Sequence, residues 1–279
     1  MPQPPPAFPR KGIHRHVADF IDSLPDLTGK TVVDIPCGDG RATFEFLKKG
    51  ATVRPLDLFP QFMTLEDVQA EYADLMEPLP LEDGSVDYVI CQEGIEHVPN
   101  QLAVLHEFNR ILKPGGTLIL TTPNYSHVRA RLSRFFLESD YWKRMPPTEI
   151  DSIWFSEQQT DKLYFGHIFL VGVHRLQTLC TLSGFRVEQR LRTEPGKSSF
   201  VLGVLLYPLL FAVTWLCYRL YRNKNSHVPR ADRERVLRER VRLNLDPATL
   251  FYKHVFWILR KEAELPEVVD SLRKMTSPD

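Results

Sequence analysis

The sequence predicts an α/β fold in which a mostly parallel β-sheet carries helices on both faces. Short apolar, β-branched runs, of which 31–35 and 86–92 are the clearest, have the composition of buried parallel strands. Runs with helical spacing of apolar residues alternate with them along the chain. The first strand-like run breaks into a glycine turn at 36–40 and continues as a helix. This is the usual opening of a nucleotide-binding α/β unit.

The other elements follow from the same patterns. In the region before the first strand, for example, Val17, Phe20 and Ile21 are spaced for the buried face of a helix. Strands that alternate with helices through right-handed crossovers form a doubly wound sheet. In chain order we expect helix 14–24, strand 31–35, helix 41–49, strand 51–57, a weaker helix 65–72, strand 72–75, strand 86–92, helix 102–112, a turn at 113–116, strand 117–121, helix 173–183, strand 185–191 and strand 252–260.

The glycine turn and a later acidic residue indicate a nucleoside cofactor. Gly38 and Gly40 would let the backbone approach a ligand that lies over the end of the first strand. Asp57 ends the second strand, where a carboxylate can accept hydrogen bonds from both hydroxyls of a ribose. For the glycines alone, a purely structural turn is the alternative.

The pattern Asp34-x-Pro36-x-Gly38-x-Gly40, followed by Asp57, resembles the cofactor motif of class I S-adenosylmethionine-dependent methyltransferases. The family has glycine where Pro36 stands, and proline removes one backbone N–H. The resemblance covers roughly 28–190 and a strand near 253–261. It implies a Rossmann-like seven-stranded sheet, with the last strand antiparallel between the fifth and sixth, and S-adenosyl-L-methionine as cofactor. The residues expected at the cofactor are Asp34, Pro36, Cys37, Gly38, Asp39, Gly40, Asp57, Asp74, Leu75 and Gln92, and Asp74 would contact the adenine amino group.

The segment Glu93-x-x-Glu96-His97 is similar to the metal-binding segment of ubiquinone-biosynthesis O-methyltransferases and of small-RNA 2′-O-methyltransferases. In both, a divalent cation lowers the pKa of a substrate hydroxyl, and the RNA enzymes use a more distant histidine that His167 matches. Two carboxylates and two imidazoles could hold Mg²⁺, Mn²⁺ or Zn²⁺. Without a metal, His97 could act as a general base. The remaining alternative is that the segment only shapes the pocket.

Residues 124–165 match no core element and are rich in aromatic and basic side chains. We expect an insertion that folds over the cofactor pocket and selects the substrate. A helical surface appendage is the alternative. The side chains that mark this segment are Tyr125, Arg129, Arg131, Arg134, Phe135, Phe136, Tyr141, Trp142, Lys143 and Arg144.

Residues 200–218 form an uncharged, apolar run of the kind that spans membranes. A single crossing would separate the sixth and seventh strands, which must share one sheet. We therefore expect a segment that enters one leaflet and returns, with Pro208 allowing a kink or a re-entrant turn. The arginine-rich segment 230–242 would face anionic headgroups. A buried core helix, or a homodimer interface through 200–221, is the alternative.

Length and composition set the limits of these predictions. A chain of 279 residues fits one α/β domain with additions. Lys+Arg and Asp+Glu both number 35, so no overall charge field attracts nucleic acid. The four cysteines lack metal-ligand spacing and indicate reduced thiols in the cytosol. We divide the chain into a disordered tail (1–12), a methyltransferase core (13–197) that includes the 124–165 insertion, a membrane-associating insertion (198–246), and a final strand with a C-terminal tail (247–279).

These features predict a methyltransferase that is peripheral or monotopic at the cytoplasmic face of a membrane. The expected acceptor is a hydroxyl group of a lipid-linked or amphiphilic small molecule, such as a quinone precursor or a lipid-linked saccharide. RNA 2′-O-methylation is an alternative that the glutamate and histidine set supports and that zero net charge opposes. An inactive nucleoside-binding scaffold is a third reading, which rests only on Pro36.

Overall fold

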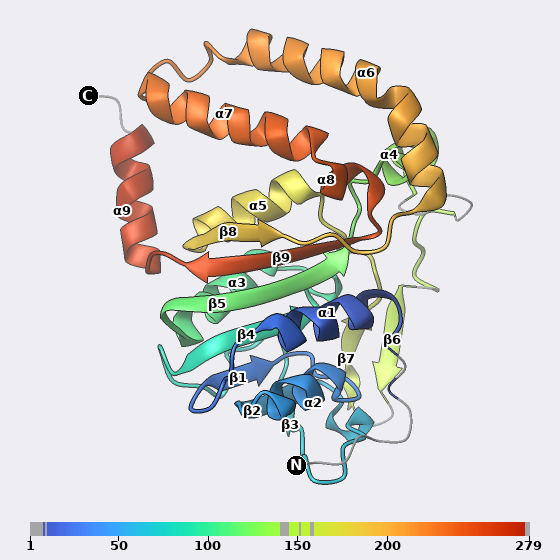
Figure 1. The fold of residues 1–279 in the computed structure, drawn as a ribbon, viewed down its shortest axis with the longest axis vertical. Helices are drawn as coiled ribbons and strands as arrows, with labels where there is room; N and C mark the ends of the chain where they lie inside the picture. The colour runs from blue at the N-terminus through green and yellow to red at the C-terminus, as the bar shows by residue number, and fades with distance from the viewer. Residues whose placement is uncertain (1–7, 9, 140–144, 151, 157–158, 277–279) are drawn as a thin grey trace.

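The computed structural model describes residues 8, 10–139, 145–150, 152–156 and 159–276. A seven-stranded sheet with the order β3-β2-β1-β4-β5-β9-β8 forms its centre (Figure 1). Strands β1 to β5 pair in parallel, while β9 is antiparallel to both β5 and β8. The predicted sheet and the position of its last strand are confirmed. The strands are β1 (Thr31–Asp34), β2 (Thr52–Asp57), β3 (Glu71–Tyr72), β4 (Val86–Gln92), β5 (Leu112–Pro123), β8 (Phe185–Arg190) and β9 (His254–Lys261).

Helices cover both faces of the sheet, and each face has its own apolar core. Phe46 of α2 is fully buried on the face that α1 and α2 cover, and Phe108 of α3 is fully buried on the face that α3 and α5 cover. Burial of side chains of this size stabilises the fold by ~1.5–3 kcal/mol each. The helices are α1 (Gly12–Ser23), α2 (Arg41–Lys48), α3 (Gln101–Ile111), α4 (Val128–Leu137), α5 (Val173–Leu182), α6 (Lys197–Tyr221), α7 (Arg230–Leu245), α8 (Pro247–Phe251) and α9 (Leu265–Thr276), with 3-10 turns η1 (Pro60–Phe62) and η2 (Ile95–His97).

Residues 65–72 do not form the predicted helix. Leu65 is buried, and its side chain lies directly over Gly40. The backbone N–H and the hydroxyl of Thr64 both bond to the carbonyl oxygen of Asp39, at 3.3 and 2.8 Å. Residues 65–70 are therefore a loop in which Leu65 packs on the glycine turn, and residues 71 and 72 form β3.

The predicted turn at 113–116 lies inside a strand. Leu112 pairs with Val86, and the next pair joins Thr117 to Tyr88. The intervening residues bulge out of β5, and Gly115 in this bulge has φ +71°. The fifth strand thus begins at Leu112 rather than at Thr117, because a strand residue on each side of the bulge keeps its partner in β4.

The apolar segment 200–218 lies within one continuous helix, α6. Of the two geometries predicted for Pro208, the re-entrant turn is therefore wrong, and a kink is consistent with the structure. The helix bends part-way along (Figure 1), and the proline inside it, Pro208, accounts for such a bend. Helix α7 runs back alongside α6. The chain enters and leaves this excursion at one place, because Gly196 N–H donates to Phe251 O (2.8 Å) and Lys253 N–H donates to Glu194 O (3.2 Å). We call residues 197–251 the α6–α8 excursion.

The 124–165 segment folds into α4 and a separate two-stranded sheet of β6 (Ile153–Ser156) and β7 (Gln159–Phe165). Helix α4 packs against α6, and the Arg129 guanidinium donates to Ser198 Oγ at 3.2 Å. The end of β7 reaches the carboxyl edge of the main sheet. Four of the side chains predicted to mark the segment, Tyr141, Trp142, Lys143 and Arg144, lie outside the described residues, as does most of the predicted tail 1–12.

Candidate active site

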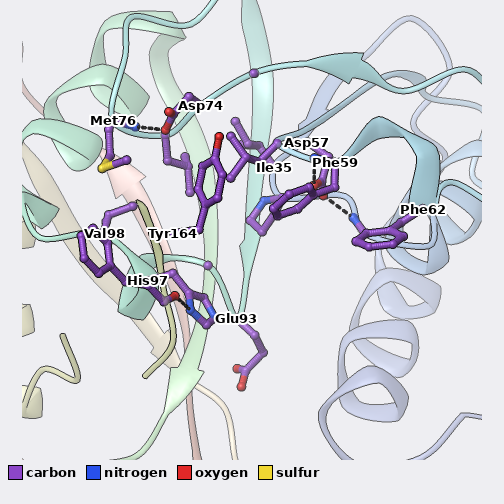
Figure 2. A pocket seen from close by; sticks show the side chains of 17 residues that line it. Ile35, Asp57, Phe59, Phe62, Asp74, Met76, Glu93, His97, Val98 and Tyr164 are labelled. Carbon is purple, nitrogen blue, oxygen red and sulfur yellow. Dashed lines mark hydrogen bonds between the residues drawn. The ribbon is translucent and has the colours of Figure 1, made fainter. Parts of the chain in front are cut away.

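A cavity of about 350 Å³ lies at the carboxyl ends of β1, β2 and β4 (Figure 2). The sheet order reverses between β1 and β4, and doubly wound sheets bind their ligands at such a switch point. The cavity volume is in the range of small-molecule sites. Its wall is mostly apolar, with a few polar groups. The lining includes Pro36, Gly38, Asp57, Phe59, Phe62, Asp74, Leu75, Glu93, His97, Tyr164 and Phe165.

The glycine turn forms although proline stands at position 36. Cys37 N–H donates to Leu56 O at 3.0 Å and so holds the turn against β2. Gly38 has φ +52° and lines the cavity, and a Cβ atom there would meet nothing within 4 Å. That open space lets a ligand approach the backbone closely. Gly40 has φ +90°, a left-handed conformation that favours glycine, and a Cβ there would lie 2.5 Å from Met63 Sδ.

Five residues predicted at the cofactor do not line the cavity. Asp34 is buried beneath the turn, where it accepts a hydrogen bond from Thr43 Oγ1 at 2.6 Å, and its burial raises its pKa to about 7. It ties β1 to α2 and has no surface toward a ligand. The Gln92 side chain bonds to the His14 ring of α1. The five are Asp34, Cys37, Asp39, Gly40 and Gln92.

Asp57 lies on the cavity wall as predicted, and its carboxylate is held in place by two backbone groups. Gly38 N–H donates to Oδ2 at 2.7 Å, and Phe59 N–H donates to Oδ1 at 2.8 Å. Each oxygen keeps a further lone pair for a hydroxyl donor. Asp74 also lines the cavity and accepts the Met76 N–H at 2.9 Å. Two oriented carboxylates therefore mark one end of the cavity.

Aromatic side chains that the sequence analysis did not single out form much of the wall. Phe59 lies edge-on to Tyr164 with ring centroids 5.3 Å apart, and Phe62 is 5.6 Å from Phe59 (Figure 2). Tyr164 and Phe165 come from β7, so the 124–165 segment does reach this cavity. Phe59 and Phe62 follow directly after Asp57, in the loop beyond the carboxyl end of β2. The position of that loop was the signal that could have identified them.

Glu93 is half-buried and Glu96 is fully buried, and the two carboxyls have different surroundings. Glu93 accepts a hydrogen bond from Thr121 Oγ1 at 2.9 Å, and its other oxygen is 3.6 Å from His254 Nε2. Glu96 is fully buried and accepts from Thr122 Oγ1 at 2.9 Å. Its second oxygen, Oε1, has no hydrogen-bond partner among the described residues. Burial raises the pKa of both carboxyls, and the charge of Glu93 raises that of Glu96 further.

His97 projects toward the cavity with a defined tautomer. Its Nδ1 is 2.8 Å from the carbonyl oxygen of Phe165. A carbonyl oxygen can only accept, so Nδ1 carries the proton and the lone pair is on Nε2. Burial lowers the pKa of His97, which favours the neutral imidazole.

Three of the four predicted metal ligands lie together. One ligand atom from each of Glu96, His97 and His167 lies within 4.8 Å of the others, and the two imidazole centroids are 4.9 Å apart. Glu93 is not in this cluster. Its backbone has φ +52°, and its carboxylate is turned toward His254. The unpartnered Oε1 of Glu96 makes the three-residue set a chemically suitable site for a cation.

Comparison with known proteins gives a family for most of this chain. Residues 10–190 match a family model described as a methyltransferase domain. The ubiquinone biosynthesis O-methyltransferase of Xanthomonas oryzae pv. oryzae (strain PXO99A) is 36% identical over 115 residues, which cover 38% of this chain and 48% of the relative. The enzyme of the same name from Paraburkholderia xenovorans (strain LB400) is 36% identical over 114 residues, which cover 38% of this chain and 49% of the relative. The chain thus spans about half the length of these curated relatives.

Solved structures share the fold. A candidate S-adenosylmethionine-dependent methyltransferase from Listeria monocytogenes is 14% identical, with a TM-score of 0.51 over 90% of this chain and 97% of that one. A candidate methyltransferase from Bacillus halodurans C-125 is 15% identical, with a TM-score of 0.51 over 90% and 99%. At such identity the likeness concerns the fold alone. The family match includes the glycine turn, Asp57 and most of the cavity wall. The chain belongs to the class I S-adenosylmethionine-dependent methyltransferases.

Proposed function

We propose that this methyltransferase methylates a hydroxyl oxygen of a lipid-linked or amphiphilic small molecule at the cytoplasmic face of a membrane. A quinone precursor or a lipid-linked saccharide is an example of such an acceptor. The observation that carries the proposal is the His97 ring, which Phe165 O orients through Nδ1, in the wall of a largely apolar, aromatic cavity. The curated relatives are named O-methyltransferases, which supports oxygen as the accepting atom.

The cofactor end of the cavity would hold S-adenosylmethionine through three residues. The Asp57 carboxylate would accept the ribose hydroxyls, and the open space at Gly38 would admit the cofactor close to the backbone. Asp74 would bind at the adenine end. The bound cofactor supplies an electrophilic methyl group on a sulfonium, so the protein contributes mainly positioning and exclusion of water.

His97 would act as the general base that removes the proton of the acceptor hydroxyl. Methyl transfer would form a bond from the acceptor oxygen to the methyl carbon and break the sulfur–carbon bond of the cofactor, and Nε2 of His97 would take the hydroxyl proton. Nδ1–H stays bonded to Phe165 O, which holds the ring in one orientation and stabilises the imidazolium that forms. Phe59 and Tyr164 would hold the apolar body of the acceptor against the cofactor.

A second proposal is that Glu96, His97 and His167 bind a divalent cation. It rests on Glu96 Oε1, a buried carboxylate oxygen without a partner in the described part of the chain. Leaving such a group unsatisfied costs ~1–3 kcal/mol or more, and a cation would remove that cost. One carboxylate and two imidazoles suit Zn²⁺ or Mn²⁺. The cation would lower the pKa of a bound hydroxyl, and His97 would then be a ligand and not the base.

The membrane part of the proposal rests on α6. By length and composition this helix could cross a bilayer, and little of it is buried against the protein. From 202 onward its half-buried residues recur at every fourth position, so the helix touches the protein along one stripe only: Leu202, Leu206, Leu210, Thr214 and Tyr218. The remaining sides expose apolar side chains. Because both ends of the α6–α8 excursion are bonded together at the sheet, we infer that α6 lies on one leaflet.

RNA is the less favoured acceptor. The formal net charge of the chain is zero. Three of the six arginines of α7 are paired with acids on the same helix: Arg235 with Asp232, and Arg230 and Arg238 with Glu234. This internal pairing also means that α7 is not the purely cationic surface that the arginine-rich sequence predicts.

The cofactor assignment is tested by replacing Asp57. Asp57→Ala should weaken binding of S-adenosylmethionine by about 1.5–3 kcal/mol, the range for hydrogen bonds to a charged group. Isothermal titration calorimetry measures the change. Asp39→Ala is the matched control, because Asp39 lies in the glycine turn but accepts from Arg41 outside the cavity. The affinity of this variant for S-adenosylmethionine should stay close to that of the wild type. Equal losses in both variants would contradict the assignment.

The acceptor class is tested by a transfer screen. Full-length protein with radiolabelled S-adenosylmethionine should label a component of a membrane lipid extract, and base treatment that cleaves methyl esters should leave the label in place, as expected for an ether. Total RNA should remain unlabelled. His97→Ala should lower the rate at least about 100-fold, the contribution of a positioned acid–base group. Label on RNA alone would overturn the proposed acceptor while the methyltransferase assignment stands.

The cation proposal is tested by metal content. Protein purified without chelator should contain close to one equivalent of Zn²⁺ or Mn²⁺ by mass spectrometry, and Glu96→Gln or His167→Ala should lose it. Glu93→Gln is the control and should retain the metal, because Glu93 is outside the three-residue cluster. Metal-free protein with full turnover after EDTA treatment would exclude the site and leave His97 as the base.

Membrane attachment is tested by fractionation. The protein should sediment with membranes, with partial release by high salt and full release by detergent. Replacement of four exposed side chains, Leu205, Leu209, Phe211 and Leu216, with Gln should move it to the soluble fraction, since each buried apolar side chain contributes ~1.5–3 kcal/mol. Cofactor affinity serves as the folding control. On intact vesicles, cysteine tags before residue 198 and after residue 245 should both be protected, and labelling of just one would mean that α6 crosses the bilayer.

A further inference from the structure

A second cavity, of about 710 Å³, lies between α6 and α7 and shares no lining residue with the first. We call it the α6–α7 groove. Its floor is a chain of hydrogen bonds that joins three helices. Asn244 Nδ2 of α7 donates to Thr214 Oγ1 of α6 at 2.7 Å, and His174 Nε2 of α5 is 3.3 Å from Asn244 Oδ1. The floor is therefore fixed by its own contacts.

The side walls of the groove are apolar. Val213 and Leu220 of α6 line it together with Leu237 and Val241 of α7. Leu220 is 75% exposed, although it is part of this wall. An apolar channel that stays open to solvent between two helices is suited to a hydrocarbon chain.

The charged groups on the lining are cations. Arg240 donates to His174 O at 2.8 Å and to Thr178 Oγ1 at 2.9 Å, both neutral acceptors. Lys224 lies over the Tyr221 ring, 5.3 Å from its centroid. No carboxylate of the described residues is paired with either cation or belongs to the lining. Arg235 on the same helix differs, because Asp232 neutralises it. Glu239, the neighbour of Arg240 on α7, acts on it electrostatically without forming an ion pair with it. The groove therefore combines apolar walls with two cations that form no ion pair within the described part of the chain.

We propose that the α6–α7 groove binds an anionic phospholipid, with an acyl chain between the two helices and the phosphate at Arg240. Lys224 adds attraction at the exposed end. The acyl chain would match the apolar walls, and the phosphate would supply an anion for the two cations. A neutral hydrocarbon would supply no such anion. The site would favour binding of the enzyme to membrane regions that contain anionic phospholipid. It rests on the proposed membrane contact of α6 and is independent of the methyl acceptor.

Cys217 provides the readout. It lines the groove and is exposed, while Cys37, Cys91 and Cys180 are buried, so a maleimide should react with Cys217 first. The full chain is incubated with dihexanoyl-phosphatidylglycerol below its micelle concentration, and the rate of alkylation is measured. A monomeric lipid has no membrane surface, so general attraction to a charged bilayer does not contribute. Cys217→Ser should remove the fast phase and so assign it.

We expect dihexanoyl-phosphatidylglycerol to slow alkylation of Cys217, and dihexanoyl-phosphatidylcholine to require at least about tenfold higher concentration. Arg240→Gln should raise the half-protecting concentration about tenfold, the loss of one charge-assisted hydrogen bond. Lys224→Gln, at the exposed end, should raise the half-protecting concentration by a smaller factor. This variant keeps the test valid if Arg240→Gln does not fold. The control Arg235→Gln, with the same loss of charge, should match the wild type.

Equal protection by the two lipids, no protection at all, or equal shifts in the Arg240 and Arg235 variants would overturn the proposal. Protection by inorganic phosphate at the same concentrations would also overturn it, because the apolar walls would then play no part. If protection is absent while the protein still sediments with vesicles, the groove proposal fails and the membrane contact of α6 stands. If the wild-type protein does not sediment with vesicles, the membrane contact of α6 is refuted instead.

Discussion

The antiparallel insertion of β9 between β5 and β8 is the constraint on which the rest of this fold depends. β9 follows the α6–α8 excursion in the chain, yet it pairs along Thr117–Pro123 on one side and Phe185–Arg190 on the other. Its last residue, Lys261, is buried and donates to Asn109 O and Leu112 O at 2.7 and 2.8 Å, which fixes it against α3 and β5. The excursion must therefore return to where it began, whatever its own composition.

This constraint separates the molecule into a part that the sequence predicts well and a part that it does not. Buried strands such as β1 and β4 are visible as apolar β-branched runs, and β9 could be placed because the family resemblance assigns its neighbours. Predictions from local sequence patterns were wrong where tertiary contacts determine the local structure. The spacing of apolar residues at 65–72 favoured a helix, but Leu65 packs on Gly40 instead. A single helix with Pro208 inside it likewise looks like two shorter segments in sequence.

The candidate site shows the same division. The cofactor end could be predicted at Gly38, Asp57 and Asp74, because strand ends and a glycine turn have fixed relations in a parallel sheet. Side-chain direction could not be predicted. Asp34 faces the interior, and Glu93 turns toward His254 because its backbone is left-handed. The aromatic wall from β7 could not be predicted for another reason. Tyr164, which contacts Phe59, lies in the 124–165 segment, where the sequence matches no element of the core fold.

The chain order of β9 also has a consequence for synthesis on the ribosome. The cavity is built from residues 35–98 and 164–165, so all of its wall has been made before α6 emerges. β9 follows only after residue 253, and at ~5–20 residues per second the stretch from 197 to 254 takes on the order of 3–12 s. During that interval the edge of β5 from Thr117 to Pro123 has no partner, and an unpaired apolar edge is prone to aggregation. α6 has by then left the ribosome as a long apolar segment. Under the proposed membrane contact of α6, a nascent chain would therefore offer this helix to a lipid surface before the sheet has closed.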